Sequence, residues 1–297
     1  MQHFRKLFFI IFYFTCSQTL LAQDTRNLSL EPKEIYKVVE SAKIVVKIGN
    51  GGAGPTGIIR ALAEGYLQES DVKYAVAWYQ DISPNTLKQL KNGVIDIALV
   101  YEREQVNQAL KEGWATNYTP IFNDHFLIVG PKNNKAELNR KDSVASAFTK
   151  IAELGKASSE PTFLSRDDNS GTNVKEKSIW NLIKNKPWQV ALPWYIKSHV
   201  FPQEALLQSE KESLYTITDW GTWLSNKDKL RNLKIYVKGG EILVNPCFAV
   251  LGSDPSKEAF DFLKYLKSPQ AQQIIAEFGK VAHEGFALFT PAAQMDF

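Results

Sequence analysis

Short apolar stretches alternate with helix-forming stretches along most of this 297-residue chain. The alternation begins with the strand-like stretch KIVVKI at residues 43–48 and a helical pattern at 55–66 that has proline at its start. Such alternation is typical of α/β folds with a mostly parallel sheet, because each helix carries the chain back to start the next strand. Residues 24–42 are expected to be a helical or irregular lead-in. Further strands are expected at 72–79, 94–101, 121 and 126–129, and further helices at 84–90 and 105–112.

Two breaks divide this alternation. Gly130-Pro131 forms the first, and Lys238-Gly239-Gly240 the second. We expect the chain to cross there between two lobes, one built from 43–130 and 246–297 and the other from 131–245, with a ligand cleft between them. The remaining strands are expected at 162–165, 194–196, 214–217, 233–237 and 242–251, and the remaining helices at 143–154, from 172, at 219–224, at 256–266 and at 269–278.

The first 22 residues have the composition of a secretory signal. Arg5 and Lys6 precede an almost wholly apolar run at 7–13, and Ala22 offers a small residue for cleavage. That run is too short to cross a bilayer, and no later run of about 18 apolar residues follows it. We therefore expect the mature chain in the periplasm or secreted. Cys16 raises lipid anchoring as an alternative, although the residues before it match a lipobox poorly.

Charge and side-chain spacing argue against two other classes of protein. Without the signal, the chain has 33 basic and 32 acidic residues, a balance that does not favour binding of nucleic acid. Cys247 would then be the only cysteine, so no intramolecular disulfide could form. His125, His199 and His283 are scattered and lack the spacing of metal ligands. We expect no metal, no cofactor and no nucleic-acid partner.

The stretch FLSRDDNSGTNVKEKSIW, at 163–180, predicts a strand, a polar loop and a helix. Ser170 is placed to cap the helix, and Gly171 lets its backbone approach a ligand closely. The first turn of a helix presents unpaired N–H groups and a partial positive charge, and Arg166 adds a fixed cation with planar donors. With Thr172, these groups form a candidate site for a small oxyanion. The alternative is a capped helix beside a surface arginine.

A second strand–loop–helix unit carries GNGGAGPTG at 49–57. Its backbone N–H groups, at Gly52 and Ala53 among others, and the Thr56 hydroxyl form a second candidate anion loop. An ordinary glycine-rich turn is the alternative. The glycines also satisfy the dinucleotide spacing, but that reading needs an acid about 20 residues on, and the next strand has none before Asp81.

The segment YTITDWGTW, at 215–223, is expected to pack its aromatic residues in the core, with Thr218 or Asp219 capping a short helix. The chain has no G-x-S-x-G nucleophile elbow. The neighbouring acids Asp167 and Asp168 resemble an acid/base pair. Beside Arg166, however, they are better placed to orient the guanidinium or to cap the helix. The sequence therefore favours binding over covalent chemistry.

In these motifs the chain resembles the periplasmic tungstate-binding proteins of the TupA type, which have the type II periplasmic-binding-protein fold. The resemblance runs from about residue 44 to residue 292. Its most specific part is the segment 163–180, which is similar to an S-R-x-D-D-S-G-T segment followed by K-E-K. The other matching segments are NDHFLIVGP at 123–131, YTITDWGTWL at 215–224, VNP at 244–246, SPQAQQIIAEFG at 268–279 and LFTPAA at 288–293.

The resemblance implies which residues contact the ligand. In that family the arginine, serine and threonine of the loop contact the oxyanion, and these are Arg166, Ser170 and Thr172 here, with Gly171 as a backbone donor. The family's hydroxyl-rich loop of the first lobe is replaced by GGAGPT at 51–56. Trp220 stands where the family has an arginine.

These observations predict an extracytoplasmic, monomeric binding protein that delivers tungstate or molybdate to the permease of an ABC importer and performs no catalysis. The alternatives are a phosphate- or organic-anion-binding protein of the same fold, a dinucleotide-dependent enzyme that uses Gly49, Gly51 and Gly54, and a scaffold that has lost its ligand. A phosphate site would benefit from a carboxylate acceptor, because phosphate retains a proton near neutral pH, whereas tungstate and sulfate need none.

Overall fold

The computed structural model describes residues 31–294 of the chain. The signal sequence expected at residues 1–22, with Cys16, lies outside the described residues. No helix within the described range is long and apolar enough to cross a membrane.

Three parallel strands form the centre of the first sheet. They are β2 (Ile44–Asn50), β3 (Ala75–Gln80) and β4 (Ile97–Val100), with β2 between the other two. The helices of this region are α1 (Ile58–Glu69), α2 (Ser83–Lys91) and α3 (Arg103–Lys111). This part of the structure confirms the predicted alternation of strands and helices. The glycine-rich loop begins at the carboxyl end of β2.

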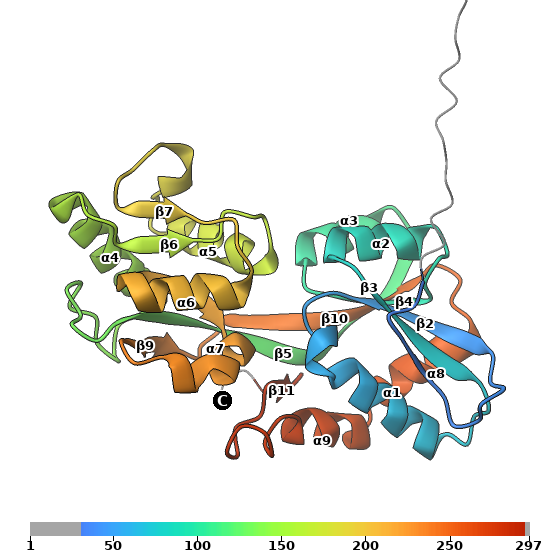
Figure 1. Cartoon of the computed structure of the whole chain (residues 1–297). Helices are drawn as coiled ribbons and strands as arrows, with labels where there is room; N and C mark the ends of the chain where they lie inside the picture. Colours follow the sequence, from blue (N-terminus) through green and yellow to red (C-terminus); the bar gives the residue numbers. More distant parts are fainter. Residues whose placement is uncertain (1–30, 295–297) are drawn as a thin grey trace, which may run out of the picture. The chain divides into compact units, whose positions relative to one another are not determined.

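One long strand, β5 (Ala115–Pro131), takes part in both sheets. Its residues 115–125 pair antiparallel with β10 (Val244–Gly252), and its residues 126–131 pair with β8 (Tyr215–Asp219) and β9 (Leu233–Lys238). Figure 1 shows β5 and β10 running side by side. The strand order is β1-β3-β2-β4-β10-β5-β8-β6-β7, and β9 and β11 (Thr290–Pro291) add to β5.

The second sheet places β8 between β5 and the short strand β6 (Phe163–Ser165). β6 pairs parallel with β8 and with β7 (Tyr195–Lys197). The helices of this region are α4 (Val144–Ser158), α5 (Gly171–Leu182), α6 (Pro202–Glu212) and α7 (Trp220–Asn226), and the chain continues into α8 (Lys257–Leu266) and α9 (Pro269–Glu277). Short 3-10 turns lie at Gly54–Thr56, Pro187–Gln189 and Lys227–Lys229.

Serine residues define where several helices begin. A serine hydroxyl accepts the backbone N–H three residues later, which satisfies one of the donors that a helix start leaves unpaired. These caps are Ser143 for α4, Ser170 for α5, Ser256 for α8 and Ser268 for α9.

Two large clusters of buried apolar residues hold the sheets and helices together. In the first, α8 packs on α1, where the Tyr66 and Phe262 rings meet edge to face at 5.0 Å between centroids. In the second, Trp180 of α5 lies 4.4 Å from the Phe148 ring of α4 and 5.2 Å from the Phe163 ring of β6. Trp180 therefore anchors α5 on β6, the strand that precedes the candidate ligand-binding loop at residues 166–170.

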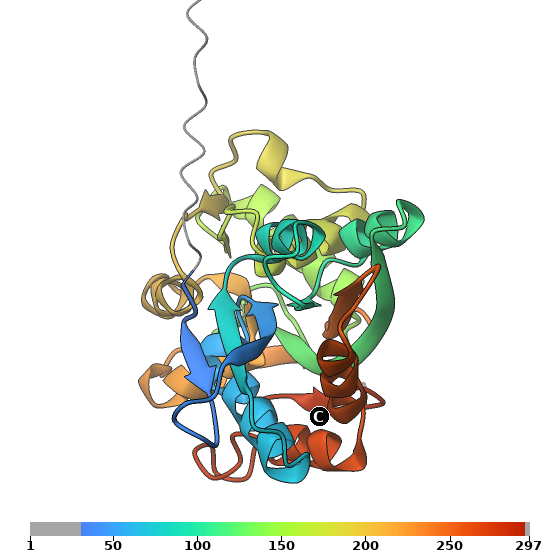
Figure 2. The ribbon, with the colours of Figure 1, turned by 90° about the vertical axis from the view of Figure 1, so that its right-hand side faces the viewer.

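The structure corrects four local predictions. The lead-in contains a strand, β1 (Glu34–Tyr36), which pairs antiparallel with the edge of β3 (Figure 2). The sheets are mixed, because β10, β5 and β8 pair antiparallel. The two strand pieces expected at 121 and 126–129 are parts of one strand of 17 residues, whose polar Asn123 and Asp124 interrupt the apolar pattern. Helix α6 was not predicted, because its N-cap, Phe201, is not a typical capping residue.

Candidate functional site

The loop between β6 and α5 has the predicted helix cap. Ser170 is extended, at φ −67° and ψ 168°, and its hydroxyl accepts the Asn173 N–H at 3.5 Å. The backbone N–H groups of Gly171 and Thr172, and the Thr172 hydroxyl, have no hydrogen-bond partner among residues 31–294. The first turn of α5 therefore keeps unpaired donors, as the sequence predicts for an anion site.

Arg166 is held in place on two sides. Its Nε donates to the Val200 carbonyl at 3.1 Å, and its Nη2 donates to a carboxylate oxygen of Asp168. The other oxygen of Asp168 accepts the Ser170 N–H at 3.0 Å. Asp168 therefore fixes the guanidinium relative to the helix start, which is the orienting role that the sequence favours over acid/base chemistry.

Asp167 is paired with two lysines. Its carboxylate lies 3.4 Å from the Nζ of Lys177 on α5 and 3.5 Å from the Nζ of Lys197 on β7. Its backbone is left-handed, at φ 43°. Both acids of the loop are thus engaged with cations, so neither is left as a free acceptor for a protonated ligand.

Beneath the loop lies the buried carboxylate of Glu176, a residue that the sequence motifs do not predict as part of the site. One of its oxygens accepts the Trp180 indole N–H at 2.9 Å and the Tyr195 hydroxyl at 2.6 Å. The other accepts from the Ser165 hydroxyl at 2.6 Å and the Asn173 side-chain amide at 3.2 Å. Burial raises the pKa of Glu176, and these hydrogen bonds oppose the rise. The K-E-K triplet is the only local signal for this residue, and it reads as a solvated helix face.

The glycine-rich loop after β2 is fixed by the buried side chain of Asn50. This amide donates to the Leu99 carbonyl at 2.8 Å and accepts the Gly54 N–H at 2.7 Å. A Cβ at Gly54 would lie 1.9 Å from the Trp78 ring, and one at Gly51 would lie 2.7 Å from the Asp81 carbonyl oxygen. These two glycines are required by close packing, as the turn interpretation predicts.

The hydroxyl of Thr56 is used within its own turn. It donates to the Ala53 carbonyl at 2.6 Å and accepts the Ile58 N–H at 3.3 Å, so it serves the start of α1. The N–H groups of Gly52 and Ala53 have no partner within the described part of the chain. They are the donors that remain for a ligand. No hydrogen bond or ion pair in that part joins this loop to the Arg166 loop.

The segment at residues 215–223 contains a helix cap, a buried tryptophan and an unpaired hydroxyl. Asp219 caps α7, where its carboxylate accepts the Thr222 N–H at 2.7 Å and the Thr222 hydroxyl at 2.6 Å. Trp220 is buried, and its indole N–H donates to the Ala287 carbonyl at 2.9 Å. Lys238 of β9 lies over the Trp220 ring at 5.9 Å. The Thr218 hydroxyl is buried without a partner in the described chain.

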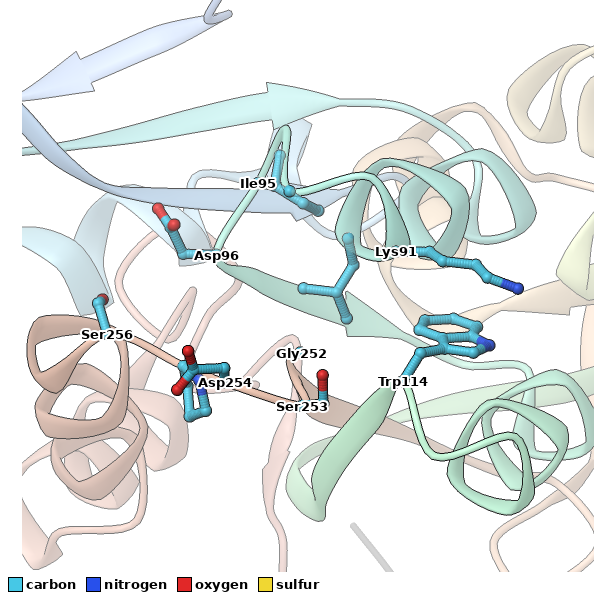
Figure 3. Close-up of a pocket in the computed structure, with 11 residues that line it drawn as sticks. Lys91, Ile95, Asp96, Trp114, Gly252, Ser253, Asp254 and Ser256 are labelled. Carbon is cyan, nitrogen blue, oxygen red and sulfur yellow. The ribbon is translucent and has the colours of Figure 1, made fainter.

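A surface hollow elsewhere contains none of the predicted site residues. Lys91 lies over the Trp114 ring at 5.1 Å on one part of its wall, while Asp96 and Asp254 present carboxylates on another (Figure 3). Two acids beside one lysine give no net attraction for an anion. A second hollow, lined by residues such as Arg140, Trp223 and Tyr236, also lies outside the predicted site. Residues 31–294 contain no group of three His, Cys, Asp or Glu side chains able to hold a metal.

Two α/β sheets that share β5, with helix starts at the carboxyl ends of β2 and β6, define a type II periplasmic binding protein. The model of the PBP superfamily domain matches residues 38–270, so the chain belongs to this superfamily. Within it, the chain is TupA-like. The solved structure of the tungstate-binding protein TupA from Desulfovibrio alaskensis G20 matches with a TM-score of 0.74 and 29% identity, over 84% of this chain and 99% of that one.

Curated proteins are also similar to this chain. The tungstate-binding protein TupA of Campylobacter jejuni is 27% identical over 233 residues, which cover 75% of this chain and 82% of the relative. A protein of Haloferax volcanii, named for anion binding in an ABC transporter, is 30% identical over 218 residues. That match covers 70% of this chain and spans only 60% of the length of the relative.

Proposed function

We propose that this chain is an extracytoplasmic solute-binding protein that captures a tetrahedral oxyanion, tungstate or molybdate, for an ABC importer. The observation that carries the proposal is the loop between β6 and α5. There a fixed guanidinium, Arg166, accompanies two unpaired N–H groups, those of Gly171 and Thr172, at a helix start. The names of the relatives from Campylobacter and Desulfovibrio support tungstate as the anion.

The proposal includes a division into two lobes, residues 43–130 with 246–297 and residues 131–245. The anion would lie between them, held by Arg166, Ser170, Gly171 and Thr172 on one side and by the loop of Gly52, Ala53 and Thr56 on the other. The protein would act as a monomer after signal cleavage near Ala22. It would perform no covalent chemistry and would bind no nucleic acid.

The charges around the loop favour a fully deprotonated anion over phosphate. A protonated phosphate oxygen needs an acceptor, but Asp167 is paired with two lysines and Asp168 with Arg166. A dinucleotide is disfavoured for another reason. Asp81, the first acid after β3, already accepts hydrogen bonds from the Ile82 N–H at 2.8 Å and from the Gln89 amide at 2.7 Å.

The test is a calorimetric titration of the purified mature protein with tungstate, molybdate, phosphate and sulfate. We expect tight binding of tungstate or molybdate, and a large loss of affinity in Arg166→Ala. Each charge-assisted hydrogen bond contributes about 1.5–3 kcal/mol, so the loss should be about tenfold or more. Arg231→Ala, at an exposed arginine elsewhere, is the matched control and should bind as the wild type does. Unchanged affinity in Arg166→Ala would show that the site is wrongly assigned, and tight binding of phosphate alone would refute tungstate and molybdate.

A further inference from the structure

We propose that Thr218 donates its hydroxyl to the same oxyanion, an inference that rests on the proposed function. Thr218 lies near the end of β8 and is only 4% exposed. Its Oγ1 has no hydrogen-bond partner among the described residues. A buried hydroxyl without a partner is costly, and such groups in native proteins usually meet a bound ligand or water. The unpaired hydroxyl therefore points to a molecule that binds beside it.

Strand register places Thr218 near the end of β6 from which the loop of Arg166 departs. β6 and β8 run parallel, and Leu164 is paired with Thr216. Side chains alternate between the two faces of a sheet along a strand, so the residue two positions further along lies on the same face. Thr218 stands at that position of β8, and Arg166 is the first residue after the end of β6. The unpaired hydroxyl of Thr218 thus lies at the end of the sheet from which the loop of Arg166 leaves β6.

Thr216 provides an internal comparison. It belongs to the same strand and the same face, and it is also buried. Its hydroxyl, however, donates to the Leu164 carbonyl at 2.8 Å. The chain can therefore satisfy a buried threonine on this face from within. It does so at Thr216 and not at Thr218, the position nearer the loop.

A lysine, Lys238, lies two strands from Thr218 on the same face of the sheet. Leu127 of β5 is paired with Thr218 on one side and with Lys238 of β9 on the other. Residues paired in this way share a face, so Thr218, Leu127 and Lys238 lie on one face of the sheet. The next residue, Asp219, directs its carboxylate to the N–H and hydroxyl of Thr222. An anion is the ligand that suits a hydroxyl on a face that also carries a lysine and that ends beside the loop of Arg166.

Most of the other hydroxyls of the candidate site are already hydrogen-bonded within the protein. Ser170 caps α5 and Thr56 bonds within its own turn, so both are engaged in local structure. Thr172 and Thr218 are left with unpaired hydroxyls in the described chain. We infer that these two threonines, with Arg166, contact different oxygens of the anion.

The experiment compares Thr218→Val with Thr216→Val, using tungstate and molybdate as probes in calorimetry and thermal unfolding of the ligand-free protein. We expect Thr218→Val to unfold at the wild-type temperature or above, because it removes an unpaired buried hydroxyl, and to lose about tenfold in affinity. Thr216→Val should unfold at a lower temperature, because the Leu164 carbonyl loses its donor, and should keep its affinity within about twofold. Thr218→Ser should restore binding.

Wild-type affinity in Thr218→Val would overturn the inference, and it would leave the proposed function intact if Arg166→Ala still lost binding. If the wild type bound none of the anions, the proposed function would fail, and this inference with it. Should Thr218→Val fail to fold, Thr218→Ala removes the same hydroxyl with less bulk, and its affinity decides in the same way.

Discussion

At the scale of single residues, Glu176 determines how the candidate site is held. Its two carboxylate oxygens accept four hydrogen bonds, from Ser165, Asn173, Trp180 and Tyr195. Ser165 of β6 and Asn173 of α5 in turn hold the loop between them, since the Ser165 hydroxyl accepts the Asp167 N–H at 3.2 Å and the Asn173 side chain accepts the Asn169 N–H at 3.1 Å. A carboxylate that touches no ligand thus fixes the backbone that presents Arg166.

Glu176→Gln should destabilise the protein. A glutamine amide nitrogen cannot accept, so the two donors on that side would lose their partner, at a cost of about 1–3 kcal/mol for each buried group left unsatisfied. Urea unfolding monitored by fluorescence measures the loss, with the exposed Glu241→Gln as control. Equal midpoints for the two variants would mean that the buried carboxylate does not stabilise the loop.

At the scale of secondary-structure elements, α5 is tied to the start of β10. Lys175 donates from Nζ to the carbonyls of Ile242 and Val244, each at 3.0 Å, and lies 5.8 Å from the Phe126 ring. Burial, and then the charge of Arg103, lower the pKa of Lys175. The second turn of α5 is therefore fastened to the start of β10, the strand that pairs with β4 and β5.

Lys175→Met keeps most of the aliphatic stem but removes both hydrogen bonds. We expect a loss of about 1–3 kcal/mol in unfolding free energy, because the two carbonyls lose a charged donor. Amide hydrogen exchange near Val244 should also speed up. Lys186→Met, at an exposed lysine just beyond α5, is the control. Unchanged exchange in Lys175→Met would show that α5 is held by its apolar face alone.

At the scale of the whole molecule, stability should depend on pH through Asp124 of β5. Burial, and then the charge of Asp219, raise the pKa of Asp124 well above its ordinary value. The folded state therefore holds a proton that the unfolded chain releases at about pH 4. Because the folded state binds more protons above that pH, stability falls as pH rises from there toward the raised pKa.

Asp124→Asn should flatten this part of the pH profile and raise stability near neutral pH. The asparagine oxygen can still accept the His125 N–H, which Asp124 accepts at 2.7 Å. Unfolding free energies measured by urea at a series of pH values above 4 provide the comparison. A variant whose profile runs parallel to that of the wild type would contradict the assignment of the slope to Asp124.

The elements that could be predicted from sequence are those whose signals are local. Ser170 and Asp219 cap the helices expected to follow them, and Gly51 and Gly54 occupy a tight turn. Residues whose partners are distant in sequence were missed or only partly understood. Glu176 is surrounded by side chains from β6, β7 and α5, and the unpaired hydroxyl of Thr218 is evident only in the folded structure. The sequence predicts β5 as two pieces because Asn123 and Asp124 interrupt its apolar pattern. Both residues pair with β10, and Asn123 also pairs with β11, but no short window of sequence contains these pairings.

Cys247 is the only cysteine among residues 31–294, and it is fully buried in β10. Burial raises the pKa of its thiol, and the reactive thiolate is thereby suppressed. We therefore expect the native thiol to react slowly with maleimide dyes in the folded protein. A single cysteine introduced at Val174, which is 53% exposed and two residues beyond Thr172, would carry the dye alone. Because the native cysteine is buried, a dye attached at one introduced cysteine could turn this protein into a fluorescent anion sensor without removal of Cys247.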